Sequence, residues 1–342
     1  MFENQTNSTE IMKKLFKYLK VFGLIIILLA GGFVLFIFAT WNKTFEAAYP
    51  EIKASTDSTL IARGKYLAYG PAHCATCHVP MDKMEAVENG EQIPLSGGWT
   101  LPIPPGTFRA RNLTPDKETG IGNLTDGEIA RVMRHSIGHD GRPIFPFMPF
   151  QNMTDEDVTA LISFLRSQEP VKNLIAPSEY TFLGKMVLAT GMIKPIGPTE
   201  KAMSSIEKEA SIPYGKYLAY SVANCVGCHT ERDLKTGKFT GPDFAGGMIM
   251  PPDEFSGGYS FMTPNLTPDQ GSGIMAQWTE AVFIQRFRNG RLIEKSPMPW
   301  GSFSRMEDVE LKALYLYLAS LQPVENKIEK IVFAPDEEMS NN

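Results

Sequence analysis

Two short stretches of the sequence place two cysteines and a histidine at the same spacing. The first is Cys74-Ala-Thr-Cys77-His78, and the second is Cys225-Val-Gly-Cys228-His229. Two thiols three positions apart can lie on one side of a helical turn and form thioethers with the vinyl groups of a porphyrin, while the adjacent imidazole reaches the iron. The pattern therefore predicts two covalently bound haem c groups, held by Cys74, Cys77 and His78 and by Cys225, Cys228 and His229.

Two other uses of such a triplet are less favourable. A closed zinc site needs four ligands, and the sequence has no further cysteine or histidine after His229. A redox-active pair of the thioredoxin kind lies in a βαβ setting, whereas the stretches after both triplets are rich in proline and glycine. All four cysteines lie in the triplets, so none is left for a long-range disulfide.

A haem iron takes a second axial ligand, and the histidine count limits the choice. The chain has five histidines, and His229 is the last of them. A methionine sulfur is an accepted partner for histidine in cytochromes. Met298 lies between two prolines, and Met148, at nearly the same distance from its own triplet, has Pro146 and Pro149 beside it. Because proline stiffens the backbone that presents the sulfur, we predict Met148 and Met298 as the distal ligands.

Two histidines of the first half leave an alternative open. His135 and His139 have no equivalents in the second half, so either could replace the methionine there and give a haem with two histidine ligands. The other interpretation is that both are ordinary solvated or hydrogen-bonded histidines. His73 directly precedes Cys74 and cannot easily reach the opposite face of the haem.

The triplets belong to a duplication that covers most of the chain. GKYLAYGPAHCATCH at residues 64–78 recurs as GKYLAYSVANCVGCH at residues 215–229, and NLTP at 112–115 recurs at 265–268. The shift between equivalent residues stays between 150 and 153. A period this long predicts two globular lobes rather than a stacked solenoid.

Each repeat carries the same helix signals. Short helices are expected before the triplets, at residues 60–69 and 214–223. Thr125 and Glu128 have capping-box spacing at the start of a second helix, whose counterpart follows Thr279. A third helix in each repeat has an amphipathic stripe, formed by Val158, Leu161, Ile162 and Leu165 and by Leu311, Leu314, Tyr315 and Leu318. The stretches SGGWTLPIPPGTF and AGGMIMPPDEFSGGY are expected to be loops.

An apolar segment near the N-terminus predicts a membrane anchor. Residues 21–40 carry no charge and are long enough to cross a bilayer core of about 30 Å as a helix. Lysines are frequent just before this segment and sparse after it, which predicts a cytoplasmic N-terminus and a periplasmic remainder at the inner membrane. A cleaved signal peptide is the alternative, but its apolar region is usually about 7–15 residues long and ends in small residues. The net charge of −5 gives no basic field for nucleic acid.

Taken together, these motifs resemble the cytochrome c fold. They are most similar to the multihaem cytochrome c subunits of bacterial membrane-bound dehydrogenases for alcohols, aldehydes and sugar acids. The similarity covers roughly residues 58–326 and includes RNLTPDKETGIG at 111–122, GRP at 141–143 and the MPF and MPW motifs at Met148 and Met298. It implies that the triplet histidines are the proximal ligands and these methionines the distal ones. Such subunits usually carry three haems and attach differently to the membrane, whereas this chain has two triplets and an N-terminal apolar segment.

The sequence therefore predicts a mostly α-helical chain, with an N-terminal transmembrane helix followed by two tandem cytochrome c domains. The predicted parts are a cytoplasmic N-terminus (1–20), the anchor (21–40), domain 1 (58–171), an interdomain strap (172–211), domain 2 (212–326) and a C-terminal tail (327–342). Within the strap, the apolar residues 180–193 are too short to span a membrane and are expected to pack across both domains.

The predicted function is electron transport in a respiratory chain rather than catalysis. A membrane-anchored dihaem cytochrome c would carry single electrons between a dehydrogenase or other respiratory donor and a terminal acceptor, such as an oxidase or respiratory complex. A dihaem peroxidase is the alternative. It needs one iron with a displaceable sixth ligand, for which His135 and His139 are candidates, and the match between Met148 and Met298 argues against it.

Overall fold

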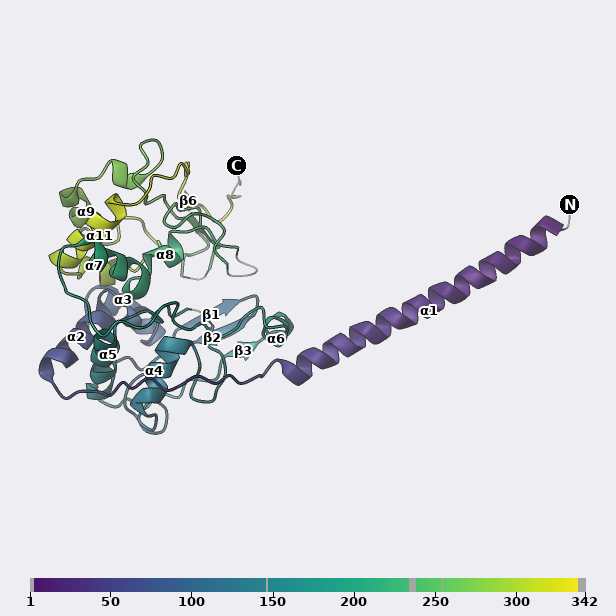
Figure 1. Ribbon diagram of the computed structural model, residues 1–342, viewed down its shortest axis with the longest axis horizontal. Coiled ribbons are helices and arrows are strands. Elements are labelled where there is room, and N and C mark those ends of the chain that lie inside the picture. The colour runs from purple at the N-terminus through teal and green to yellow at the C-terminus, as the bar shows by residue number, and fades with distance from the viewer. Residues whose placement is uncertain (1–2, 146, 234–237, 254, 338–342) are drawn as a thin grey trace. The chain divides into compact units, whose positions relative to one another are not determined.

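The computed structural model describes the chain except for residues 1–2, 146, 234–237, 254 and 338–342 (Figure 1). It divides into two compact units. The first unit comprises Met1–Lys43, Ile103–Gly106 and Glu179–Lys194, and the second comprises Thr44–Pro102, Thr107–Ser178 and Pro195–Asn342. Apart from Ile103–Gly106, both repeats lie in the second unit, so the sites and their surroundings are described within it.

The first unit is built on α1 (Glu3–Thr40), one uninterrupted helix of 38 residues (Figure 1). Within its stretch Met12–Thr40, a window of 18 residues reaches a mean hydropathy of 3.0, and the side chains of this window are almost entirely exposed. By length and composition this helix can cross a membrane. The sequence predicted a span over residues 21–40, and the structure continues the same helix back to Glu3.

Residues 180–193 also belong to the first unit, where they contribute to β3 (Glu179–Tyr180) and α6 (Phe182–Ala189). Thr181 caps α6, because its side-chain oxygen accepts a hydrogen bond of 3.2 Å from the backbone N–H of Gly184. The sequence predicted that this stretch packs across both repeats. Instead, Phe182 packs against Phe38 of α1 with the ring centroids 6.3 Å apart.

The second unit contains the helices of both repeats. The first repeat has α2 (Ser58–Tyr69), η1 (Cys74–Thr76), η2 (Met81–Lys83), α3 (Met84–Glu88), α4 (Asp126–His135) and α5 (Asp155–Ser167). The second has α7 (Ile212–Tyr217), the π-helical turn η3 (Leu218–Val222), α8 (Cys225–Cys228), η4 (Ile274–Ala276), α9 (Glu280–Arg288), α10 (Trp300–Ser304) and α11 (Asp308–Ala319). The prediction of a mostly helical chain is confirmed, and Thr125 and Glu128 form the predicted capping box of α4.

Short strands interrupt the stretches that were predicted to be loops. They are β1 (Thr100–Ile103), β2 (Gly106–Arg109) and β4 (Ile249–Met250), while β5 (Ser260–Met262) directly follows the second stretch and β6 (Val332–Phe333) lies near the C-terminus. The strands β4, β5 and β6 form one antiparallel sheet in which Ile249 pairs with Met262 and Ser260 with Phe333. The loop prediction was wrong here because strands of two to four residues show no periodicity and form only through long-range pairing.

The first and last helices of each repeat cross at a glycine. A Cβ atom on Gly64 of α2 would lie 1.8 Å from the carbonyl oxygen of Ala160 in α5. A Cβ atom on Gly215 of α7 would lie 1.9 Å from the carbonyl oxygen of Ala313 in α11. Only glycine permits this approach. The predicted stripes of α5 and α11 face the same core, in which Val158, Leu161, Leu311 and Leu314 are fully or almost fully buried.

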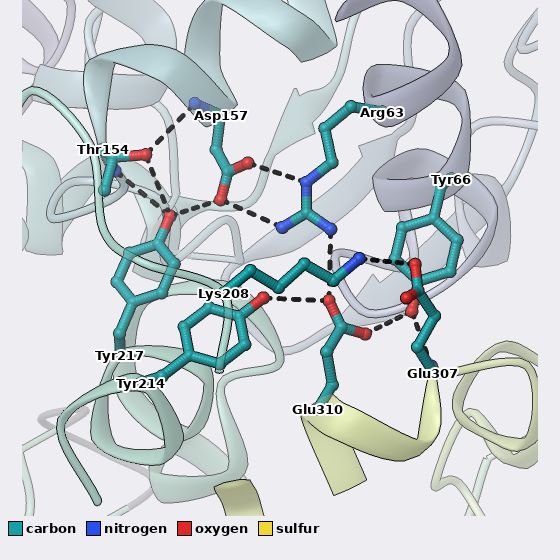
Figure 2. Close-up of polar contacts among 9 residues, drawn as sticks. All are labelled: Arg63, Tyr66, Thr154, Asp157, Lys208, Tyr214, Tyr217, Glu307 and Glu310. Atoms are coloured by element: carbon teal, nitrogen blue, oxygen red, sulfur yellow. Dashed lines mark hydrogen bonds and ion pairs between the residues drawn. The ribbon is translucent and has the colours of Figure 1, made fainter. Parts of the chain in front are cut away.

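A buried polar cluster joins the two repeats (Figure 2). The guanidinium of Arg63 in α2 lies 3.0 Å from a carboxylate oxygen of Asp157 in α5 and 3.1 Å from one of Glu310 in α11. Glu310 is completely buried, and it also accepts hydrogen bonds from the hydroxyls of Tyr66 and Tyr214. A buried carboxylate with three donors is stabilised where an unpaired one would be costly, so this cluster fixes how the repeats meet.

A second contact between the repeats runs from α10 to the end of α3. Glu88 accepts hydrogen bonds of 2.7 Å from Arg291 and 2.8 Å from the backbone N–H of Gly301. The guanidinium of Arg305 donates to the carbonyl oxygens of Tyr69, Val87 and Glu88. One repeat thus supplies cations and N–H groups to carbonyl and carboxylate oxygens of the other.

Candidate haem-binding sites

Each pair of cysteines lies on one short helical turn. Cys74 begins η1, and Cys225 and Cys228 bound α8. The residue before each turn has a left-handed backbone, with φ of 39° at His73 and 52° at Asn224. The chain then closes one turn, since the histidine N–H donates to the carbonyl oxygen of the first cysteine at 2.9 Å in both repeats. All four thiols are free, so these pairs are not disulfides, and their spacing on one turn fits two thioether bonds to one porphyrin.

The two triplet histidines are oriented in the same way. His78 Nδ1 lies 2.8 Å from the carbonyl oxygen of Arg111, and His229 Nδ1 lies 3.2 Å from that of Pro264. Because a carbonyl only accepts, Nδ1 carries the proton and Nε2 keeps its lone pair for a metal. Burial lowers the pKa of both imidazoles, that of His229 to about 4, which keeps them neutral and able to coordinate.

A glycine loop holds each of these histidines from the other side. The N–H groups of Gly97 and Gly246 donate to the carbonyl oxygens of His78 and His229, both at 2.9 Å. Both glycines have φ of +75°, and a Cβ atom on either would lie 2.6 Å from the backbone carbon of the residue whose carbonyl holds the imidazole. The GG motif therefore lets the segment that carries this carbonyl oxygen approach the triplet closely.

The asparagine of each NLTP motif ties this segment to the residues that follow the last helix of its repeat, α5 or α11. Asn112 Oδ1 accepts from the Thr114 N–H at 2.9 Å, and its Nδ2 donates to the Val171 carbonyl at 2.8 Å. Asn265 makes the same two bonds in the second repeat, again at 2.9 and 2.8 Å. In the sequence this motif is visible as a repeat without a role. The available signal was that Val171 and Val324, which accept these bonds, end the repeated segments EPV and QPV at the same distance from each motif.

The predicted methionine ligands occupy equivalent positions. Met148 and Met298 are both half-buried against the core, and each precedes by two residues a buried aromatic side chain, Phe150 or Trp300. Their carbonyl oxygens are also engaged, by Gln151 Nε2 at 2.9 Å and by the Trp300 N–H at 2.8 Å. Pro146, one of the two prolines predicted to stiffen the loop of Met148, lies outside the described residues. Coordination of iron by these two methionines stays a prediction.

The remaining histidines have other surroundings. His135 is the last residue of α4, and burial together with Arg134 and Arg131 lowers its pKa. His139 is exposed in the turn that follows. The ring of His73 packs edge-on against Phe303 of the other repeat, with centroids 5.5 Å apart, and its Nδ1 lies 3.1 Å from the Pro71 carbonyl oxygen. His73 therefore takes part in the contact between the repeats.

One buried polar atom of the second site points to an anionic group. Arg232 follows Cys228 by four residues, and its Nε is buried without a hydrogen-bond partner among the described residues. Its guanidinium lies 4.4 Å from the ring centroid of Phe239, and a terminal nitrogen donates to the Gly227 carbonyl at 3.3 Å. A guanidinium with a free N–H suits a carboxylate, which the propionates of haem provide. The cysteines and histidine of the triplet, together with this arginine, fit a haem group.

Comparison with known proteins supports this assignment. The cytochrome c family model matches residues 61–169. The fructose dehydrogenase cytochrome subunit of Gluconobacter japonicus is 29% identical over 283 residues, which are 78% of this chain and 54% of that protein. The cytochrome c subunit of the quinone-dependent alcohol dehydrogenase of Gluconacetobacter polyoxogenes is 29% identical over 305 residues, which are 82% of this chain and 62% of that protein.

A relative of similar size is the diheme cytochrome c-type protein of Cereibacter sphaeroides, 26% identical over 314 residues, which are 89% of this chain and 98% of that protein. The chain spans less than two thirds of the length of the two dehydrogenase relatives. Residues 61–169 are therefore a cytochrome c domain, which implies covalently bound haem c, and the chain is a relative of the cytochrome c subunits of dehydrogenases and of a diheme cytochrome c.

Proposed function

We propose that this protein is a membrane-anchored dihaem cytochrome c that carries single electrons from a dehydrogenase to a further acceptor. One haem is held by Cys74, Cys77 and His78 with Met148, and the second by Cys225, Cys228 and His229 with Met298. The bound haem supplies an iron that alternates between its ferric and ferrous states, and no substrate chemistry by the protein is required.

The observation that carries this proposal is the repeated orientation of the triplet histidines. His78 and His229 are each fixed through Nδ1 by the carbonyl oxygen of the residue just before an NLTP motif, Arg111 at 2.8 Å and Pro264 at 3.2 Å. A hydrogen bond to the second ring nitrogen sets the tautomer and the ring direction of a metal ligand. The second repeat reproduces this arrangement, including the GG loop and the hydrogen bonds of the NLTP asparagine. We therefore propose a second haem and two domains, at residues 58–171 and 212–326.

The methionines are proposed as distal ligands because their surroundings match. Each lies on a proline-flanked loop just before the closing part of its repeat, where a hydrogen bond to its carbonyl oxygen holds the residue. A thioether opposite a histidine favours the ferrous state and raises the reduction potential. His135 and His139, by contrast, have no counterparts in the second repeat.

The helix α1 is proposed to anchor the protein in the inner membrane. Its apolar part is long enough to cross the bilayer, and lysines concentrate at its N-terminal side. This distribution favours a cytoplasmic N-terminus and haem domains on the periplasmic side.

The donor is proposed to be a dehydrogenase subunit, because relatives carry the names of fructose, gluconate and quinone-linked alcohol dehydrogenase cytochrome subunits. The acceptor would be a terminal oxidase or another respiratory complex. These names do not favour the peroxidase alternative.

The test uses membranes from the native cells. Alcohols, aldehydes, sugars and sugar acids are added one at a time while the c-type absorption is followed. We expect at least one substrate to reduce the haems of this protein, and a strain lacking the chain to lose that part of the signal. Rapid turnover of hydrogen peroxide by the purified, reduced protein, with no reduction by any dehydrogenase substrate, would support the peroxidase instead.

A further inference from the structure

The short helix α6 covers the last turns of the apolar helix α1. Ile37 has no exposed surface, whereas its neighbours Phe36 and Phe38 are 44% and 52% exposed. Among the described side chains of α1, Ile37 is the one that is buried. The ring of Phe182, at the start of α6, packs against Phe38 with centroids 6.3 Å apart. The buried Ile37 and the contact at Phe38 therefore mark the level on α1 at which the α6 region packs.

Aromatic rings and lysines hold this contact together. The Lys185 ammonium lies 5.2 Å from the ring centroids of both Phe38 and Trp41. Trp41 packs against Tyr180 at 5.8 Å, and Lys43 Nζ donates to the Ala189 carbonyl at 3.2 Å. Tryptophan and tyrosine rings beside lysines whose stems run along apolar surface are typical of the level where a bilayer meets water.

The outer side of α6 exposes large apolar side chains next to this belt. Phe182 is 48% exposed and Leu183 40%, while Met192, shortly after the helix, is 54% exposed. The opposite side of α6 is buried, as Val187, Leu188 and Ala189 show. The helix therefore has one side that packs within its unit and another that presents apolar surface beside the exposed apolar surface of α1.

The depth of this surface follows from helix geometry. A span over residues 21–40 is about 30 Å long at a rise of about 1.5 Å per residue, which matches the hydrocarbon core. Ile37 lies three residues before its end, or about 5 Å inside the boundary. Because α6 packs on α1 at Phe38, next to the buried Ile37, it lies at the level of the lipid if α1 spans the bilayer.

We propose that α6 lies in the outer boundary between headgroups and acyl chains, with Phe182, Leu183 and Met192 in contact with lipid. This apolar surface contacts the outer leaflet of the membrane that α1 spans, because it is continuous with the exposed apolar surface of α1. Lys43 and Lys185 lie where they can meet the phosphates of anionic lipids. The protein thus has a second, monotopic contact with the membrane. This inference rests on the proposed membrane anchoring of α1.

The experiment measures the surroundings of single spin labels in the full-length holoprotein, reconstituted in vesicles of phosphatidylethanolamine and phosphatidylglycerol. Haem attachment consumes the native thiols, so one introduced cysteine is labelled alone, and unlabelled wild type checks this. Leu183→Cys reports on α6, Leu29→Cys on the middle of α1, and Met203→Cys on an exposed residue of the second unit. The haem content of each variant confirms that it has folded.

We expect the ratio of oxygen to nickel-chelate accessibility to be several-fold higher at position 183 than at 203, with position 29 the highest. A lipid-like label at 29 together with a water-like label at 183 would overturn the inference and leave the anchor intact. A water-like label at 29 would instead refute the anchor, and with it the inference. The lipid is then exchanged for detergent micelles, and the protein is reconstituted into lipid again. The difference between positions 183 and 203 should return in the lipid.

Discussion

Tyr66 in α2 and Tyr217 in α7 occupy equivalent positions, and each donates its hydroxyl hydrogen bond to a carboxylate of the other repeat (Figure 2). Tyr66 contacts Glu310, and Tyr217 contacts Asp157 at 2.7 Å. Each hydroxyl also accepts from the backbone N–H of a helix-capping residue, Glu307 for Tyr66 at 2.8 Å and Thr154 for Tyr217 at 3.2 Å. The repeats thus meet as two copies meet in an isologous homodimer, where each contact occurs twice.

The first prediction concerns these two tyrosines. Tyr66→Phe and Tyr217→Phe each remove a donor from a buried carboxylate, and hydrogen bonds to charged groups contribute about 1.5–3 kcal/mol. We therefore expect each variant to lower the free energy of unfolding by about this amount in chemical denaturation. The exposed Tyr259→Phe serves as the control and should change it by less than about 0.5 kcal/mol. A large loss for one of the two variants and none for the other would contradict the equivalence.

The same tyrosines predict how stability changes with alkaline pH. Burial, and after it the neighbouring carboxylate, raises the pKa of Tyr66, Tyr214 and Tyr217 well above the ordinary value of 10.0. The unfolded chain therefore ionises these hydroxyls first, so their contribution is complete below pH 10.0 and is lost as the pH rises above it. Each retained proton contributes a slope of about 1.4 kcal/mol per pH unit.

The variant that combines Tyr66→Phe and Tyr217→Phe should show a shallower loss of stability above pH 10.0, because it removes two of these groups. The unfolding free energy is measured by denaturant titration at several pH values. Equal slopes in the wild type and the double variant would contradict the assignment, while Tyr259→Phe should keep the wild-type slope.

The third prediction concerns Asn112, whose hydrogen bonds hold the segment that orients His78. Asn112→Ala removes the bonds to Thr114 and Val171, and leaves buried donors and acceptors unpaired, at a cost of about 2–3 kcal/mol. The segment around Arg111, whose carbonyl oxygen holds His78 Nδ1, should then become less fixed, which alters the potential of one haem and leaves the other unchanged. A redox titration and thermal unfolding measure the two effects. The control is Asn123→Ala, an exposed residue in the same stretch whose side chain donates to the Lys117 carbonyl.

Much of the helical framework could be predicted from the sequence. The stripes of α5 and α11 and the capping box of α4 depend on residues three or four positions apart, and local pattern reveals such spacing. The short strands could not be predicted, because their pairing joins residues far apart, such as Ser260 and Phe333. The same holds for the position of residues 180–193, which follows from packing on α1.

The site residues show the same division. The triplets and the methionines are visible as repeated motifs, whereas the carbonyls that orient His78 and His229 lie 33 and 35 residues away. The contact between Tyr66 and Glu310 joins residues 244 positions apart, and no local pattern links them. The duplication did contain a signal for this contact. Tyr66 is equivalent to Tyr217, and Asp157 is equivalent to Glu310, so both copies keep a tyrosine and an acidic residue at these positions.

The fourth prediction tests the distal ligands. Met148→His and Met298→His should each lower one of two midpoint potentials, because histidine replaces a ligand that favours the ferrous state. Met203→His, at an exposed position, is the control and should leave both potentials unchanged. If Met148→His changes nothing while a change at His135 or His139 does, the haem of the first repeat has two histidine ligands instead.

The haem content per chain tests the central claim most directly. The full-length protein is purified from membranes after export, and its haem is determined by the pyridine haemochrome method against the protein concentration. The account predicts two haems in the wild type and one in each paired variant, Cys74→Ser with Cys77→Ser and Cys225→Ser with Cys228→Ser. A single haem in the wild type, or a second repeat that binds none after the first pair is removed, would contradict it.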